Sequence, residues 1–295
     1  MDDFYKPYSQ RSLDSQYTSR LQFILERGIY VKETAQDIGA LTCFGTLPQM
    51  VFDLANGVPL ITERKVGFWR KPLAEIIAFI NGARTIDEIA SFGCPFWESY
   101  RGKGEKLGLA PDDMGPGSYG AAFHDFEVPG GGTLNQFAQL VEQIRKYPKM
   151  RTHLVTPWKP YYTARGPNRK VIVAPCHGWL HFRVLNGELH MEMHQRSADF
   201  PIGVPSNMFQ YAALLLMVSQ VTGYRPGTFI HSFGDAHIYA DQANHVRELV
   251  KRGPRAFPTL RLDPSIKNLF DFRVEHFTLE DYDPHPAVSD IPFAA

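Results

Sequence analysis

The sequence predicts an α+β fold, with a mixed β-sheet flanked by helices and one long helix buried at the centre. Segments with helical periodicity and segments with strand-like alternation are interleaved along the chain, without repeats or low-complexity tracts. Residues 207–223 are apolar on nearly every side, as expected of a helix in the core. The chain has 295 residues, 44% of them hydrophobic, and we expect one domain over residues 1–295.

Three amphipathic helices are expected besides the central one, at residues 15–29, 71–83 and 133–148. Pro72 near the start and Gly82 past the end bound the second of them. Thr133 is the expected cap of the third helix, and Pro148 is expected to stop it.

Strands are expected at residues 39–62, 150–158, 178–197, 228–233, 259–264 and 272–279. In the first segment Asn56-Gly57 predicts a turn, and in the third Asn186-Gly187 predicts a β-hairpin. Residues 101–118 are rich in glycine and proline, and residues 159–170 are polar and cationic. Both segments are therefore expected to be loops at the surface.

The composition argues against several classes of protein. The 31 basic side chains balance 31 acidic ones, which disfavours a nucleic-acid partner or a polybasic membrane anchor. Cys43, Cys94 and Cys176 form no close pair, which argues against a disulfide framework and a cysteine-based zinc site. The first residues lack the apolar core of a signal peptide, and no apolar stretch is long enough to span a bilayer. We therefore expect a soluble cytoplasmic protein without a membrane partner.

Cys176 is the first candidate catalytic residue. Most free cysteines pack as small buried hydrophobes, so the residue type alone leaves both roles open. A catalytic thiolate needs positive charge nearby at neutral pH, and Arg196 could supply it across the expected hairpin. The run "QRSAD" also places Ser197 and Asp199 where the strand should end. The structural alternative is a surface turn in which one of them caps a neighbouring segment.

His237 and Tyr239 are two residues apart on an expected strand, so their side chains point the same way. Together they could bind one hydroxyl group, or they could form an internally satisfied pair. Glu75 lies on an apolar helix segment, which favours a buried acid with a raised pKa over a solvated side chain. Trp97 and Tyr119 are, by residue type, more typical of core or loop anchors.

No metal site is expected from the sequence. His190 and His194 share one face of a strand, but no third ligand accompanies them. The glycines of "PGGGT" lack the lysine of a phosphate-binding loop.

Together, these fragments resemble the folate-dependent thymidylate synthase family. The resemblance is close from about Thr152 to Pro286, where "APCH", "QRSAD", "GVPSN", "GDAHIY", "PRAFPTLRL" and "FRVEHFTLEDYDPHP" occur in the family's order. The segments "QMVFDLANGVPLIT", "LAEIIAF", "FWE" and "GPGSYG" extend it more loosely over most of the chain. The resemblance implies a thymidylate synthase-like fold and a homodimer packed sheet to sheet. It also implies two substrates, 5,10-methylenetetrahydrofolate and a pyrimidine nucleoside monophosphate.

A covalent mechanism follows from the resemblance. The Cys176 thiolate would add to C6 of the pyrimidine, which makes C5 a nucleophile toward the methylene group of the folate. Arg196 would lower the pKa of the thiol. Glu75, with ordered water, would move protons around O4, and Tyr119 would help to place the water that removes the C5 proton.

The resemblance also assigns the residues that bind the nucleotide. Arg196, Ser197 and Arg151 of the partner subunit would hold the phosphate, a task to which bidentate guanidinium groups are suited. Asn207 would read N3 and O4 of the base. The residues assigned to the sugar 3′-hydroxyl are His237 and Tyr239.

The folate would be held at the other end of the same site. Asp199, counted among the catalytic and the nucleotide-contacting residues as well, would hold the pterin, and Trp97 would pack on it. Gly203 is also assigned to the folate. Ala294 stands where the family's mobile C-terminal tail closes.

The chain departs from the family around the phosphate. Ala35 stands where the family has an arginine in a loop that closes over the phosphate, and Lys32 would replace it only if the loop is longer. Thr152 stands in place of a second arginine. The polar loop 159–170 is longer than in the family. The candidates to replace the missing phosphate-binding arginines are Arg165, Arg169 and Lys170.

Three functions remain open. Methylation of dUMP to dTMP is favoured by Asn207, because an amide offers both a donor and an acceptor to uracil, whereas a carboxyl group suits cytosine. Trp97 favours it too, because the family uses this residue to direct the intermediate to hydride transfer. Hydroxymethylation of dUMP, dCMP or CMP, in which water replaces hydride, is favoured by the altered phosphate loops. Ser206 favours it as well, because it makes the site more polar where the family has a phenylalanine before Asn207.

The third function belongs to a different class, a non-catalytic nucleotide- or RNA-binding descendant of the fold. The zero net charge disfavours broad RNA affinity. The residues whose presence disfavours a non-catalytic protein are Cys176, Glu75 and Asp199.

Overall fold

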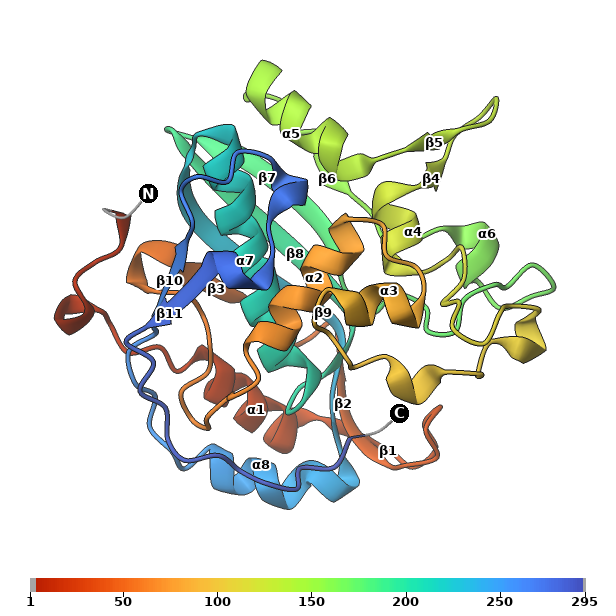
Figure 1. Ribbon diagram of the computed structural model, residues 1–295. Coiled ribbons are helices and arrows are strands. Elements are labelled where there is room, and N and C mark those ends of the chain that lie inside the picture. Colours follow the sequence, from red (N-terminus) through yellow and green to blue (C-terminus); the bar gives the residue numbers. More distant parts are fainter. Residues whose placement is uncertain (1–3, 294–295) are drawn as a thin grey trace.

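The structure is a computed structural model and describes residues 4–293 (Figure 1). Its centre is a mixed sheet in the order β1-β2-β9-β8-β7-β6, with β3 also paired to β9. Its strands are β1 (Ile29–Val31), β2 (Ala40–Phe44), β3 (Met50–Asp53), β6 (His153–Val155), β7 (Trp179–Leu185), β8 (Glu188–Asp199) and β9 (Arg225–Tyr239). Two small sheets pair β4 (Phe126–Glu127) with β5 (Thr133–Leu134) and β10 (Thr259–Leu262) with β11 (Phe277–Glu280).

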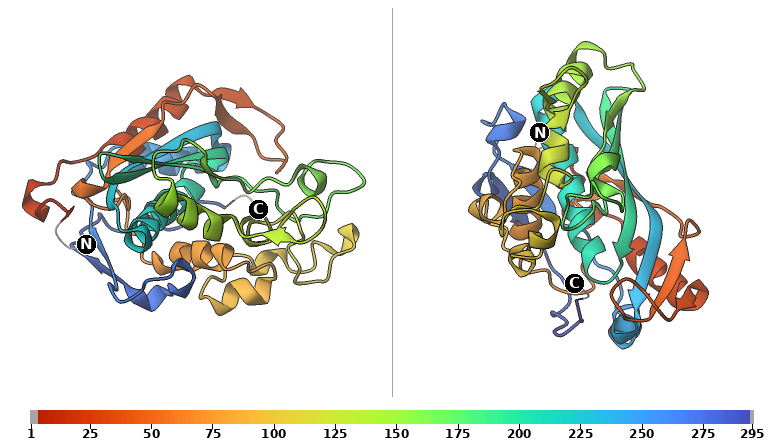
Figure 2. Two further views of the ribbon diagram at one scale, coloured as in Figure 1. Left: turned by 90° about the horizontal axis from the view of Figure 1, so that it is seen from above. Right: turned by 90° about the vertical axis from the view of Figure 1, so that its right-hand side faces the viewer.

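The helices complete a mixed α+β architecture, as the sequence predicts. They are α1 (Gln16–Arg27), α2 (Arg70–Ile80), α3 (Ile86–Ser91), α4 (Tyr119–His124), α5 (Gln136–Lys146), α6 (Pro160–Thr163), α7 (Gly203–Thr222) and α8 (Ala243–Leu249). Figure 2 shows α2, α5 and α7 on one side of the main sheet, with α7 directly against it. No helix within residues 4–293 is long and apolar enough to cross a membrane.

The helix α7 connects the two parallel strands β8 and β9, and nearly all of its 20 residues are buried. It begins four residues before the predicted position, because Pro205 is compatible with the first turn of a helix, where no backbone donor is needed. It ends at Gly223, whose φ of 81° suits a glycine that terminates a helix. The early start places Asn207 inside the helix, on the side that faces the end of β8.

The hairpin predicted at Asn186-Gly187 is present. The two residues have φ angles of 49° and 83°, as a type I′ turn requires, and they join the antiparallel strands β7 and β8. The strand β8 is 12 residues long and continues past the hairpin to Asp199. The hairpin therefore sets the register that brings the "QRSAD" run to the end of the sheet.

Two local predictions were wrong. Asn56-Gly57 forms a turn, but no strand follows it, because the N–H of Val58 pairs with the carbonyl of Pro258 instead of returning along β3. The helix α5 is capped by Asn135, whose side chain accepts the N–H of Ala138. Thr133, the predicted cap, lies in the short strand β5.

The face of the main sheet opposite α7 is largely uncovered (Figure 2). Along β8 every second residue from Glu192 to Arg196 is exposed, while the residues between them are buried. One row of side chains crosses this face over five strands, because the register aligns Val51, Ile230, Glu192, His181 and Leu154. Val51 and Leu154 are 43% and 62% exposed, so apolar side chains at both ends of the row remain open to solvent.

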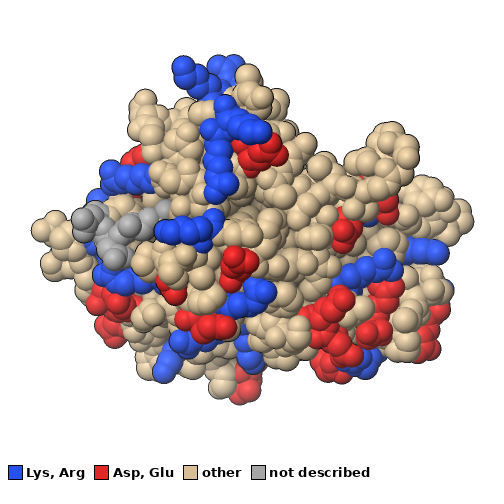
Figure 3. Space-filling view, turned by 45° about the horizontal axis from the view of Figure 1, so that its top comes forward, with Lys and Arg blue, Asp and Glu red and all other residues tan. Residues whose placement is uncertain are grey.

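Figure 3 shows acidic and basic side chains interspersed over much of one face of the molecule, with basic side chains gathered at the top of the view. This distribution accompanies the zero net charge of the chain. A local group of cations, rather than the overall field, must therefore hold any anionic ligand.

Candidate active site

Cys176 lies in the segment before β7, beside the end of β8. Its carbonyl accepts hydrogen bonds from the backbone N–H groups of Arg196, at 2.7 Å, and Ser197, at 3.2 Å. The parallel register of β8 and β9 then aligns Asp199 with His237. The fold thus gathers the cysteine and the motif residues of two strands at one end of the sheet.

The Cys176 thiol is controlled by two opposing effects. A guanidinium nitrogen of Arg196 lies 3.6 Å from Sγ, and the same side chain donates to the carbonyls of Ala174 and Pro175, which fix its position. Burial raises the pKa of Cys176, while the charge of Arg196 and a hydrogen bond from Ser197 lower it. Burial wins, so the structure holds a mostly protonated thiol whose ionisation depends on Arg196.

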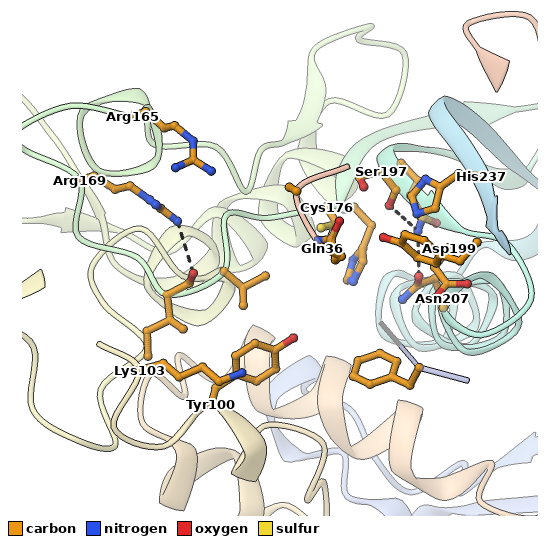
Figure 4. A pocket seen from close by; sticks show the side chains of 18 of the residues that line it. Gln36, Tyr100, Lys103, Arg165, Arg169, Cys176, Ser197, Asp199, Asn207 and His237 are labelled. Carbon is orange, nitrogen blue, oxygen red and sulfur yellow. Dashed lines mark hydrogen bonds between the residues drawn. The ribbon is translucent and has the colours of Figure 1, made fainter. Parts of the chain in front are cut away.

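A cavity of about 570 Å³ opens at Cys176. A second cavity of about 490 Å³ adjoins it and shares Cys176, Ser197, His237 and Tyr239. These volumes lie within the range of small-molecule sites. Figure 4 shows Ser197, Asp199, Asn207 and His237 on one side of the larger cavity. Across from them the figure shows Lys103, Arg165 and Arg169.

The amide of Asn207 is held by a chain of buried hydrogen bonds. Its Oδ1 accepts from Nε2 of Gln195 at 3.0 Å, and Oε1 of Gln195 lies 2.8 Å from Nε2 of His231. Burial lowers the pKa of His231 well below its usual value, so this ring is neutral and donates to Gln195. Because Asn207 is fixed through Oδ1, its Nδ2 donor remains available to a ligand in the cavity.

His237 and Tyr239 offer a second polar surface to the cavity. Nδ1 of His237 lies 2.8 Å from a carboxylate oxygen of Asp235, which only accepts, so Nδ1 carries a proton and Nε2 is left for a ligand. Burial raises the pKa of Tyr239 to about 12, so its hydroxyl stays protonated. Nε2 of His237 and the hydroxyl of Tyr239 can therefore bind one hydroxyl group together.

Glu75 lies behind the cavity wall, fully enclosed by protein. Burial raises its pKa to about 7, against the opposing effect of the hydrogen bond from Trp97 and of the neighbouring Gln210 amide. The indole N–H of Trp97 donates to the carboxylate at 2.9 Å. An acid with this pKa can both take up and release a proton near neutral pH.

Tyr119 joins this buried region to the cysteine. Its hydroxyl accepts the backbone N–H of Cys176 at 2.6 Å, and its ring stacks on Phe79 and His177 with centroids 4.7 Å apart in each case. Burial raises the pKa of Tyr119 well above its usual value. The tyrosine is therefore a neutral hydroxyl whose own proton can still be donated.

The loop side of the larger cavity carries positive charge. Lys103, Lys106, Arg165 and Arg169 line it, and none of them forms an ion pair within the part of the chain that the structure describes. Their two loops dock on each other, since the N–H of Ile172 donates to the carbonyl of Met114 at 3.2 Å. The arrangement forms an anion-binding wall.

The loop between β1 and β2 contributes no charge to either cavity. Ala35 and Gln36 line both cavities, whereas Lys32 lines neither. Lys170 and Thr152 do not line them either. Of the candidate replacements, Arg165 lines both cavities and Arg169 lines the larger one.

Two other residues singled out from the sequence lie away from the cavity wall. Arg151 is exposed at the edge of the sheet beside β6 and lines neither cavity. Trp97 is 9% exposed and bonded to Glu75, and it packs on Tyr100, which does line the larger cavity. Ala294 lies outside the described residues, whereas Gly203 lines the larger cavity.

Sequence reasoning missed several residues of the site. His177 and Gln195 adjoin Cys176 and Arg196 in the same motifs, and that adjacency was the available signal. Burial lowers the pKa of His177 to about 3, so it is neutral, and its Nδ1 lies 2.8 Å from the hydroxyl of Tyr211. No pattern in the sequence indicates the remaining ones, which are Gln36, Tyr100, Lys103, Lys106, Gln242 and Phe293.

Among residues 4–293 no group of three His, Cys, Asp or Glu side chains is placed to hold a metal ion. The site brings together one thiol, a guanidinium group 3.6 Å from it and a buried acid whose pKa is about 7. These features are those expected of a group-transfer site in which a cysteine is the nucleophile and the substrate is an anion. A family model described as thymidylate synthase matches residues 15–294, and the chain belongs to that family. The family carries out folate-dependent C5 methylation or hydroxymethylation of pyrimidine nucleotides with methylenetetrahydrofolate as cosubstrate.

The raised pKa of Glu75 predicts a dependence of stability on pH. Its pKa lies at about 7 in the folded state and at 4.5 in the unfolded chain, so the folded state binds the extra proton between these values. A stabilisation of about 3 kcal/mol is therefore fully present below pH 4.5 and is lost as the pH rises through 7. Urea unfolding across this range should show the loss in the unmodified chain.

The variant Glu75→Gln is the matched control, because it keeps an acceptor for Trp97 and cannot titrate. Glu63 and Asp199 also have raised pKa values, so only the difference between the two proteins isolates Glu75. Parallel pH profiles for the two proteins would show that Glu75 titrates as an exposed acid does.

Proposed function

We propose that this protein transfers the one-carbon unit of 5,10-methylenetetrahydrofolate to C5 of a pyrimidine nucleoside monophosphate, and that the reaction is the reductive methylation of dUMP to dTMP. The observation that carries the proposal is the position of Cys176. Its thiol lies at the junction of two cavities, 3.6 Å from the guanidinium group of Arg196. One cavity suffices for a nucleotide, and the adjoining space accommodates a second substrate.

In this proposal the Cys176 thiolate adds to C6 of the base, and C5 bonds to the methylene carbon, whose bonds to the folate nitrogens break. Tetrahydrofolate then gives the hydride that completes the methyl group and leaves as dihydrofolate, and the C6–S bond breaks to return the thiolate. Arg196 stabilises the thiolate and, with Ser197, contacts the phosphate. Glu75 exchanges a proton with O4 through water, and Tyr119 orients the water that takes the proton from C5. The roles of Glu75 and Tyr119 match the protonation states that burial gives them, whereas Cys176 must lose its proton against burial, with the charge of Arg196 favouring the thiolate.

Arg165 and Arg169 would complete the phosphate-binding site. The cavity-lining residues of the β1–β2 loop, Ala35 and Gln36, are uncharged, while Arg165 borders both cavities and forms no ion pair among the described residues. Two arginines on one loop can bind a phosphate in the bidentate manner that lysine cannot.

A homodimer packed through the open face of the sheet belongs to the same proposal. The row that ends in Val51 and Leu154 leaves apolar surface in solvent, and a second copy of the chain would cover it. Arg151 lies at the edge of this face and outside its own cavities, a position from which it would reach the phosphate in the other subunit.

Hydroxymethylation is the second candidate, and one observation favours it. Trp97, which the family uses to direct the intermediate to hydride transfer, is bonded to Glu75 and does not line the cavities, whereas the polar side chain of Gln36 does. A more polar wall admits water, which would release a hydroxymethyl product and tetrahydrofolate.

A product analysis tests the proposal. The protein is incubated with methylenetetrahydrofolate and, separately, dUMP, dCMP, UMP and CMP, and each nucleotide is analysed by mass spectrometry while dihydrofolate is followed by absorbance. We expect methylated dUMP with an equal amount of dihydrofolate. A hydroxymethylated nucleotide without dihydrofolate establishes the second candidate, and binding without any product rejects both.

The variants Cys176→Ala and Arg151→Glu test the nucleophile and the dimer together. Each homodimer should be inactive, because one lacks the thiol and the other repels the phosphate. Mixed and re-associated subunits should regain turnover, since one of the two sites then has the cysteine and the partner's arginine intact. Absence of recovery, with mixed dimers verified by mass spectrometry, would remove Arg151 from the site. Activity of Cys176→Ala alone would remove the covalent mechanism.

Asn207→Asp tests how the base is read. The substitution replaces the Nδ2 donor with oxygen, so the preference in kcat/KM should move from uracil to cytosine nucleotides by at least tenfold, a change of about 1.4 kcal/mol. Gln195 can still donate to the new carboxylate, so the local structure should be retained. An unchanged preference would mean that another group reads the base.

A further inference from the structure

Gln242 connects two parts of the site that are far apart in the sequence. It lies in a short turn directly after β9 and is completely buried. Its Nε2 donates to both carboxylate oxygens of Asp199, at 3.3 and 3.2 Å, and to the backbone carbonyl of Pro292 at 2.9 Å. Its Oε1 accepts the N–H of Tyr239 at 3.0 Å.

The orientation of this amide is fixed by its partners. The N–H of Tyr239 can only donate, and the Asp199 carboxylate and Pro292 carbonyl can only accept. A flipped amide would face oxygen with oxygen at Asp199 and Pro292, and N–H with N–H at Tyr239. One buried side chain therefore uses all of its hydrogen-bonding groups to join β9, the end of β8 and the C-terminal segment.

The C-terminal segment has little else to hold it. Its previous anchors are His285 and Pro286, which bond to Thr62 and Arg252. Within the described part of the chain, residues 287–293 make no hydrogen bond to the remainder except the one from Gln242 to Pro292. None of these residues is fully buried, and Phe293, the neighbour of Pro292, lines the larger cavity together with Asp199.

We propose that Gln242 is a positioning residue that couples the carboxylate of Asp199 to the C-terminal segment 287–293. Through it, the wall that carries Asp199 and Phe293 is assembled before the folate enters. Gln242 itself does not line the cavities, so it acts through its two partners. The identity of the ligand rests on the proposed function, whereas the coupling is a property of the chain alone.

This coupling predicts different effects on the two substrates. Ser197 and His237 face the nucleotide and keep their positions through the β8–β9 ladder, which does not depend on the Gln242 side chain. Tyr239 donates to Gln242 but is also held by its pairing with Ala40 of β2.

Asp199 and Phe293 both border the cavity. Gln242 holds the Asp199 carboxylate together with the N–H of Ile202, and it holds Pro292, the neighbour of Phe293. Loss of the amide should therefore weaken folate binding and leave nucleotide binding almost unchanged.

The test compares Gln242→Met and Gln242→Glu with Gln220→Met in the full-length protein. Gln220 is a matched control, because its Nε2 also bridges two acceptors, the carbonyls of Asp263 and Ile266, away from the cavities. Three properties are measured: cleavage within residues 287–293 by limited proteolysis and mass spectrometry, the KM for methylenetetrahydrofolate, and the Kd for dUMP by calorimetry.

We expect both Gln242 variants to be cleaved within residues 287–293 at least tenfold faster than the unmodified chain. Their KM for the folate should rise about tenfold, which corresponds to about 1.4 kcal/mol, and the Kd for dUMP should change less than twofold. Gln220→Met should lose stability without either effect. The Gln242→Glu variant keeps an acceptor for Tyr239, so it separates loss of the donor from loss of packing.

The inference is overturned if cleavage is unchanged, or if the folate and dUMP constants move together. Cleavage that increases without a change in folate affinity also overturns it, because the segment would then be held but not coupled to the site. Should the protein turn over no nucleotide at all, the proposed function fails, and proteolysis with calorimetric binding of tetrahydrofolate still decides the coupling.

Discussion

The parallel pairing of β8 with β9 is the constraint on which the site depends. It aligns Asp199 with His237, and the end of β8 also holds the carbonyl of Cys176 by two backbone hydrogen bonds. Parallel strands require a crossover between them, and here the crossover is the buried helix α7, which brings Asn207 to the same end. The parallel pairing of β8 and β9 and the crossover that it requires thus bring side chains from two strands, a loop and a helix to one end of the sheet.

Burial then decides what these groups can do. It raises the pKa of Glu75 to about 7, lowers that of His177 to about 3 and keeps Tyr119 neutral. The same burial opposes ionisation of Cys176, and the charge of Arg196 only partly offsets it. The site therefore contains poised acids and neutral donors, with one fixed guanidinium group where negative charge has to develop.

Much of the fold was predictable because local chemistry determined it. The Asn186-Gly187 turn and the apolar helix α7 follow from backbone preference and burial, which a single sequence displays. The cap of α5 was misplaced because Thr133 and Asn135 are both good caps, and strand pairing with residues 126–127 decided between them. The second strand after Asn56-Gly57 was wrong for a similar reason, since its partner lies some 200 residues away at Pro258.

The site was predictable where the motifs are contiguous, as in "QRSAD", and not where loops meet. Lys103 and Arg169 line the same cavity only because two long loops dock. The role of Gln242 depends on its hydrogen bond to Pro292, a contact between distant parts of the chain that the sequence does not indicate. The exposure of Arg196 has a further consequence. The alternation along β8 places the Arg196 side chain on the open face of the sheet, where its guanidinium group also lies 3.6 Å from Sγ of Cys176. Covering that face would exclude solvent from the guanidinium group and strengthen its pull on the thiol. In the proposed homodimer, assembly and thiol ionisation would be linked equilibria, and dilution alone would lower the thiolate fraction of Cys176.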